Sequence, residues 1–125
     1  YDSARAAYAQ AGLMAADIDL FELHDASTIM AALSLEAAGF AERGMGVRLA
    51  LDGAIGLRGS IPISTLGGLL GRGDVGSASG VYQAVEAVQQ LRGAAGANQI
   101  DGVRVAMTQS MSGNGACVAT HILQV

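Results

Sequence analysis

Three short segments, residues 24–27, 73–80 and 110–115, carry the groups best suited to chemistry. In the first, His24 is followed by Asp25 and could orient a water molecule or a substrate oxygen, because an imidazole both donates and accepts hydrogen bonds. The second is rich in glycine and precedes a predicted helix, so its backbone N–H groups could hold a phosphate or a thioester oxygen. The third is a tight turn of serine and glycine between two predicted strands. Each segment lies at the end of an element, which is where α/β proteins place their sites.

The same segments have structural interpretations that need no ligand. A histidine at a strand end is commonly tied to a neighbouring carbonyl oxygen or, in this chain, to Asp25. The glycine-rich segment lacks the lysine of a P-loop. Gly71, Gly73 and Gly76 match the G-x-G-x-x-G spacing, but no long strand precedes them, so we discount a dinucleotide site.

Cysteine and histidine are too scarce and too scattered to indicate a metal site. The only cysteine, Cys117, lies within an apolar predicted strand, which favours a buried structural thiol over a nucleophile. His121 lies on the opposite strand parity from its apolar neighbours and is expected to be a surface or packing residue. Two histidines and one cysteine at these separations show no metal-ligand spacing, so no metal is predicted.

Helices on either side of these segments are expected to position them. The predicted helices are residues 2–11, 28–38, 47–52 and 77–92. Gly12 occupies a natural C-cap position after the first helix. Ser27 or Asp25 can cap the second helix, because both side chains accept hydrogen bonds from backbone N–H groups.

Two of these helices carry apolar residues at helical spacing, which predicts their buried sides. In the helix 28–38 this set is Ile29, Leu33 and Ala37. In the helix 77–92 the buried stripe is expected to be formed by Val81, Val85 and Val88, and continued by Leu91.

The strands complete an α/β arrangement. Residues 18–23 form a short apolar run that predicts a strand buried on at least one side. A brief extended piece at 61–64 contains Pro62, which favours an edge or irregular position. Residues 103–109 and 116–125 predict an antiparallel hairpin across the third segment. The order of elements indicates helices layered on a sheet.

Composition limits the classes to which the chain can belong. Its 125 residues suit one domain, 51% of them are hydrophobic and 14% are charged, which is the reverse of a disordered chain. The net charge of −4 argues against nucleic-acid binding, because phosphates need a basic surface. No apolar run is long enough for a membrane helix. The single cysteine favours a reducing compartment, so we expect a cytoplasmic protein. An opening without methionine suggests a fragment.

The three segments resemble conserved motifs of thiolases of the sterol-carrier-protein and archaeal type. E-L-H-D-A-S-T-I at 22–29 is similar to the H-D-A-F loop of that family. G-G-L-L at 67–70, followed by G-D-V-G-S-A-S-G at 73–80, resembles its G-G-x-x-x-x-G-H-P-x-G-A-T-G segment. S-M-S-G-N-G at 110–115 aligns with its N-M-G-G-x-G turn. The resemblance covers essentially the whole chain, in order.

This resemblance implies the fold of a C-terminal thiolase half: α/β, with layered helices on a mixed sheet. Family members have two similar halves, and the nucleophilic cysteine lies in the N-terminal one. Residues 1–125 would then be one thiolase-like C-terminal domain, a fragment that is missing its first strand. Such a fragment is not expected to be active alone.

The resemblance also implies a site, with substitutions at important positions. His24 is retained and would help to hold a thioester oxygen, with Asp25 beside it. Asp74 replaces the histidine that activates the family's cysteine, and an aspartate cannot form a cysteine–histidine ion pair. Ser110 replaces the cysteine or asparagine of the last turn. We therefore assign His24, Asp74 and Ser110 as catalytic positions. The substrate-binding positions are Asp25, Gly76, Ser77 and Gly113.

For function, the resemblance implies an acyl-CoA-binding domain of an acyltransferase-like protein, with a coenzyme A thioester as substrate and no cofactor. Ordinary thiolase chemistry is not expected, because the family's catalytic histidine is replaced. One alternative is a non-catalytic subunit that pairs with an active paralogue or with a small zinc-ribbon/OB-fold protein. Another is an aldolase that cleaves a β-hydroxyacyl-CoA, with Asp74 as the base if burial raises its pKa. The expected partners are an N-terminal thiolase half and further copies in an oligomer, with neither nucleic acid nor membrane.

Overall fold

The central sheet is built from the apolar and alternating segments of the sequence. The computed structural model describes residues 1–125, apart from the side chain of Asn114, and in this part a sheet has the order β1 (Leu20–Glu22), β2 (Val105–Ser112), β3 (Cys117–Gln124). β1 runs parallel to β2, with Leu20 opposite Ala106, and β2 runs antiparallel to β3. The predicted hairpin and the mixed sheet are confirmed, and β2 continues to Ser112.

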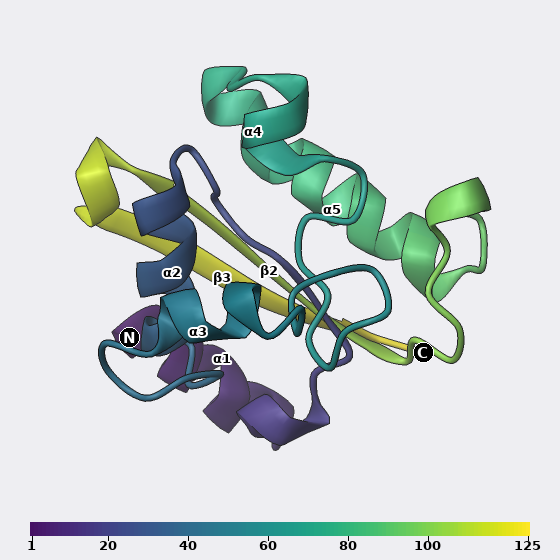
Figure 1. Ribbon diagram of the computed structural model, residues 1–125, viewed down its shortest axis with the longest axis horizontal. Coiled ribbons are helices and arrows are strands. Elements are labelled where there is room, and N and C mark those ends of the chain that lie inside the picture. Colours follow the sequence, from purple (N-terminus) through teal and green to yellow (C-terminus); the bar gives the residue numbers. More distant parts are fainter.

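Helices cover both faces of the sheet and give three layers (Figure 1). Because side chains alternate along a strand, Phe21 and Met107 enter one core, which they share with α1 (Asp2–Ala11) and α2 (Thr28–Ala37). Leu20 and Ala106 enter a second core on the opposite face, where α5 (Ser79–Leu91) supplies Ala87. The expected layered α/β fold is therefore present.

Local capping signals determine where several helices begin and end. Gly12 ends α1 in the left-handed conformation, with φ of 69°. The Ser27 hydroxyl accepts a hydrogen bond from the backbone N–H of Met30 at 3.3 Å and so caps α2. The short α3 (Gly46–Leu51) also lies where it was expected. Single 3-10 turns occur at Ala15–Asp17, Gly76–Ala78, Gly96–Asn98 and Gly113–Gly115.

A short helix, α4 (Gly68–Arg72), was not predicted. It lies inside the glycine-rich segment, between Gly67 with φ of 104° and Gly73 with φ of 98°. Both glycines adopt a left-handed backbone that other residues rarely tolerate, so they bound the helix. Five residues are too few to show a periodic apolar pattern, which is why sequence reasoning indicated only turns.

The expected buried side of α5 is wrong for Val81 and Val85, whereas Leu91 packs against the second core and Val88 is partly buried. Val81 is 64% exposed and Val85 is 49% exposed. The side chains that face the sheet include Gln83, Glu86 and Gln90. These polar groups can be buried because distant segments pair with some of them, as Gln90 Nε2 does by donating to the Thr65 hydroxyl oxygen at 3.0 Å.

The expected side of α2 is also wrong, because Ile29 and Leu33 are exposed and the helix buries Ala32, Ser34 and Leu35 instead. On another side, α3 approaches α2 closely, because a Cβ added at Gly46 would lie 2.3 Å from the carbonyl oxygen of Ala32. In the part of the chain that the structure describes, every helix is too short or too polar to span a lipid bilayer.

Candidate functional site

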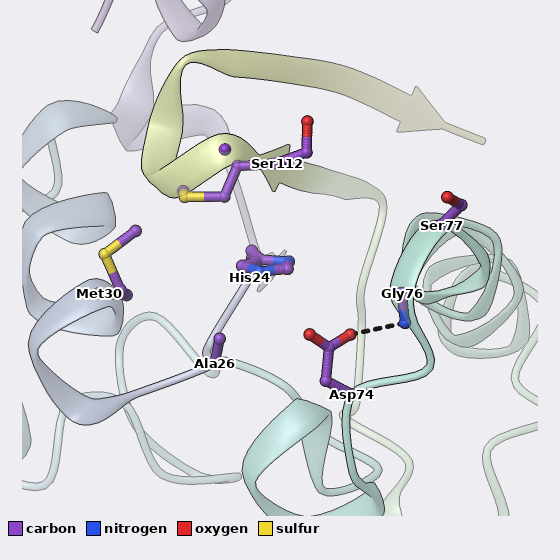
Figure 2. Close-up of a pocket in the computed structure, with 9 residues that line it drawn as sticks. His24, Ala26, Met30, Asp74, Gly76, Ser77 and Ser112 are labelled. Atoms are coloured by element: carbon purple, nitrogen blue, oxygen red, sulfur yellow. Dashed lines mark hydrogen bonds between the residues drawn. The ribbon is translucent and has the colours of Figure 1, made fainter.

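The three sequence segments meet around one cavity of about 390 Å³ (Figure 2). Residues from the end of β1, from the loop before α5 and from the turn between β2 and β3 face it. The lining residues are His24, Ala26, Met30, Asp74, Gly76, Ser77, Met111, Ser112 and Gly113. They converge because β1 and β2 are parallel neighbours, so the carboxyl ends of both strands lie at the same edge of the sheet.

His24 occupies the first side of the cavity, two residues beyond the end of β1. Its side chain is partly buried, and its Nδ1 atom is buried with no hydrogen-bond partner among the described residues. The structural alternative, in which this atom is tied to a neighbouring carbonyl or to Asp25, is therefore not seen. An imidazole nitrogen placed in this way can donate a hydrogen bond to a ligand oxygen, or accept one from a water molecule.

Asp25 points away from this cavity. Its carboxylate is buried, and Oδ1 accepts a hydrogen bond from the backbone N–H of Leu69 at 2.8 Å. It lines a separate, mostly apolar cavity of about 200 Å³ between α2 and α3. The structure thus brings Asp25 against α4, and does not bring it together with the other predicted site residues.

Asp74 forms the second side of the cavity, and its carboxylate points into the space that His24 also faces (Figure 2). Oδ1 accepts hydrogen bonds from the backbone N–H of Gly76 at 2.8 Å and from the Ser79 hydroxyl at 2.9 Å. These two bonds, together with a smaller attraction from His24, lower the pKa of Asp74 against a small opposing effect of burial. The carboxylate is exposed and ionised at neutral pH. The condition under which Asp74 could act as the aldolase base, a pKa raised by burial, is therefore not met.

Ser110 lies beside the main cavity and lines a neighbouring one of about 220 Å³. His24, Gly76 and Ser77 border both cavities. A Cβ added at Gly80 would lie 3.1 Å from the Ser110 hydroxyl oxygen, so this serine packs closely against the start of α5. The glycine at position 80 makes that approach possible.

Cys117 is exposed, so the prediction of a buried thiol is wrong. It begins β3 opposite Ser112 and lines the neighbouring cavity. β3 is an edge strand, and α5 packs mainly over β2, which leaves this side of β3 uncovered. His121, on the same strand parity, is exposed as expected. An apolar strand pattern could not reveal that the strand lies at an edge.

A buried polar cluster beneath α5 was missed at the sequence level. Glu22 is 1% exposed, and its Oε1 accepts hydrogen bonds from the backbone N–H and the hydroxyl of Thr65, each at 3.0 Å. Burial raises the pKa of Glu22 to about 7; the Thr65 bonds oppose this effect and the neighbouring Glu86 carboxylate adds to it. Arg72 donates to Glu86 from the opposite side. The available signal was a glutamate between Phe21 and Leu23 in a buried strand.

Among the described residues, no three side chains of histidine, cysteine, aspartate or glutamate are placed so that they could hold a metal ion together.

Comparisons with known proteins agree with the motifs. The family model described as "Thiolase C-terminal domain-like" matches residues 1–125. The acetyl-CoA acetyltransferase of Methanothermobacter thermautotrophicus is 43% identical over 121 residues, which is 97% of this chain and 32% of the relative. Sterol carrier protein 2 of Homo sapiens is 37% identical over 119 residues, 95% of this chain and 22% of the relative.

Among solved structures, one described as "Ltp2-ChsH2(DUF35) aldolase" matches with a TM-score of 0.88 and 29% identity, over 98% of this chain and 31% of that one. The chain therefore spans about a third or less of the proteins that it resembles.

Proposed function

Because the chain belongs to the family of thiolase C-terminal domains, we propose that it forms one side of an acyl-CoA site in a larger thiolase-like protein. In this proposal His24 is the catalytic group that donates a hydrogen bond to the thioester oxygen. Gly76, Ser77 and Gly113 contact the acyl-CoA, and no cofactor takes part. A cytoplasmic location remains a prediction.

The observation that carries the proposal is the imidazole of His24, which lines the cavity where the three loops meet and whose buried Nδ1 has no hydrogen-bond partner among the described residues. A thioester carbonyl gains negative charge when it is attacked or when an enolate forms. Hydrogen-bond donors that are already in place stabilise that charge without reorganisation. The glycines and serines around the imidazole have small side chains or none, so they leave room for the thioester to approach.

The Asp74 carboxylate argues against ordinary thiolysis or condensation by this site. Activation of a cysteine nucleophile needs a base that can become the cation of an ion pair. Asp74 is an anion with a lowered pKa, and it would repel a thiolate beside it. We therefore propose that the site binds and polarises a thioester and that it does not activate a cysteine through position 74.

Aldol cleavage is the second candidate, favoured by the aldolase that this chain resembles in structure. In that reaction a base takes the hydroxyl proton of a β-hydroxyacyl-CoA, and the bond between the α and β carbons breaks. The electron pair enters the thioester as an enolate, which His24 would stabilise, and the α carbon is then protonated. Asp74 is a weak base because its pKa is lowered, so the stronger base would come from the remainder of the protein.

The proposed partners follow from two uncovered surfaces. β3 lies at the edge of the described sheet, and α5 exposes Val81 and Val85. Unpaired strand edges and apolar faces favour association. We propose that an N-terminal thiolase half covers them in an oligomer. The aldolase it resembles is described with a ChsH2(DUF35) component, and a zinc-ribbon/OB-fold partner is the corresponding proposal for this chain.

The test uses the full-length protein with two probes, acetyl-CoA and a β-hydroxyacyl-CoA. We expect His24→Ala to reduce turnover by roughly 10²- to 10³-fold, the usual effect of removing one oxyanion-hole donor. The control is His121→Ala, which removes an exposed histidine outside the cavity. Equal activity of both variants would contradict the role of His24. Binding of either probe without turnover would favour the non-catalytic subunit.

A further inference from the structure

The short helix α4 connects the two sides of the cavity. It follows the extended segment at 61–64 and leads, through Gly73, into the loop that carries Asp74. An isolated helix shorter than about 12 residues is marginal in water, so contacts outside α4 must hold its five residues in place. Two charged side chains, one at each end of α4, provide such contacts.

Asp25 holds the beginning of α4. Its Oδ1 accepts the hydrogen bond from the backbone N–H of Leu69, and its carboxylate lies against Gly68. A Cβ added at Gly68 would come within 2.2 Å of Asp25 Oδ2, so the backbone of the helix touches the carboxylate. Because Asp25 directly follows His24 in the chain, this contact ties α4 to the first side of the cavity.

Arg72 holds the end of α4. Its Nη1 donates to Glu86 on α5, and its guanidinium lies 4.6 Å from the centre of the Tyr82 ring. The side chains of Arg72 and Glu86 are largely buried, at 19% and 7% exposed. An ion pair and a cation–π contact in such surroundings are screened by water less than surface pairs are.

Asp74 is in turn attached to α5, because its carboxylate accepts a hydrogen bond from Ser79 in the first turn of that helix. A continuous set of contacts therefore runs from His24 through Asp25, α4 and Arg72 to α5 and Asp74. We propose that Asp25 and Arg72 are positioning residues that brace α4 and thereby hold Asp74 beside His24. The importance of this geometry for chemistry rests on the proposed function of the cavity.

The test measures how far the charge of Asp74 displaces the NMR resonance of the His24 ring, which we call the coupling between the two residues. It needs no ligand. In the full protein labelled at histidine, the ring resonance of His24 is assigned with His24→Gln, and that of His121 serves as reference. Asp74→Asn removes the facing charge, so it should move the His24 resonance. In the backgrounds Arg72→Leu and Asp25→Ala we expect this displacement to fall at least threefold.

Conservative and control variants separate positioning from general loss of structure. Asp25→Asn keeps an oxygen that accepts the hydrogen bond from Leu69, so it should retain most of the coupling. Arg72→Lys keeps the positive charge, so its coupling should be larger than that of Arg72→Leu. The matched control Arg92→Leu changes an exposed arginine and should leave the coupling unchanged. If Arg72→Leu does not fold, Tyr82→Leu removes only the cation–π contact and should weaken the coupling.

The proposal would be overturned if Asp74→Asn displaced the His24 resonance as far in the Arg72→Leu and Asp25→Ala backgrounds as it does in the parent protein. Absence of acyl-CoA binding would contradict the proposed function and leave this result intact.

Discussion

At the scale of single residues, Glu22 is the most unusual group in the protein. It lies in the shortest strand of the described sheet, is almost fully buried, and shares its surroundings with Glu86 and Arg72. If both glutamates were ionised, their two negative charges would face the single positive charge of Arg72, and one negative charge would be left in excess. Burial therefore favours the protonated form of Glu22 up to about pH 7.

This raised pKa predicts that stability falls as the pH rises. The folded protein keeps the Glu22 proton to about pH 7, whereas the unfolded chain releases it near 4.5. The folded state then binds more protons between these values, so the free energy of unfolding decreases across this range by up to roughly 3 kcal/mol and levels off above it. Urea unfolding between pH 4 and 8 measures the effect.

Glu22→Gln should flatten this dependence, because glutamine resembles the protonated acid and can still accept from Thr65. The exposed Glu42→Gln is the matched control and should keep the parent profile. A Glu22→Gln variant that loses stability with pH as steeply as the parent would show that another group is responsible.

At the scale of elements, α4 begins at Gly68, where a side chain would be strained. Gly68 has φ of 57°, and an added Cβ would meet the Asp25 carboxylate. We expect Gly68→Ala to reduce the free energy of unfolding by about 2 kcal/mol or more, from backbone strain and from the displaced carboxylate.

Gly71→Ala in the same helix provides the control. Gly71 has no positive φ, and an added Cβ meets nothing within 4 Å. Alanine there should be neutral or stabilise by about 0.5 to 1 kcal/mol, as expected for a helix interior. Similar losses for both variants in chemical denaturation would contradict a specific effect of the Gly68 backbone and its contact with the Asp25 carboxylate.

At the scale of the whole molecule, α5 presents two exposed valines on its outer face. Val81 and Val85 lie on the outer side of a helix that buries mostly polar residues together with Ala87. If the remainder of the protein covers this face, Val85→Asp in the full-length protein buries a charge and should cost several kcal/mol.

The control for this face is Gln89→Asp, a polar position on the same helix, which should change stability by less than about 1 kcal/mol. Thermal unfolding and size-exclusion chromatography of the two variants measure stability and assembly. Equal stability and equal elution volumes would show that the α5 valines stay in contact with water.

Much of the architecture follows from sequence alone. Gly12 and the Ser27 cap act on neighbours within about four residues, and the alternation of a strand repeats every two residues, so these signals survive without a tertiary structure. The family motifs identified the three loops, and the parallel pairing of β1 with β2 brings them together as α/β folds do.

Tertiary structure decided which sides of these elements are buried and how the site is held. Val81 and Val85 of α5 face outward. The polar side of this helix is buried because Thr65 and Arg72 reach it from earlier segments and Asn98 reaches it from the loop that follows. Cys117 is exposed because β3 lies at an edge, and Asp25 braces α4 where it was expected to touch substrate. Local patterns record a residue's neighbours along the chain, whereas burial and pKa depend on partners that only folding brings close.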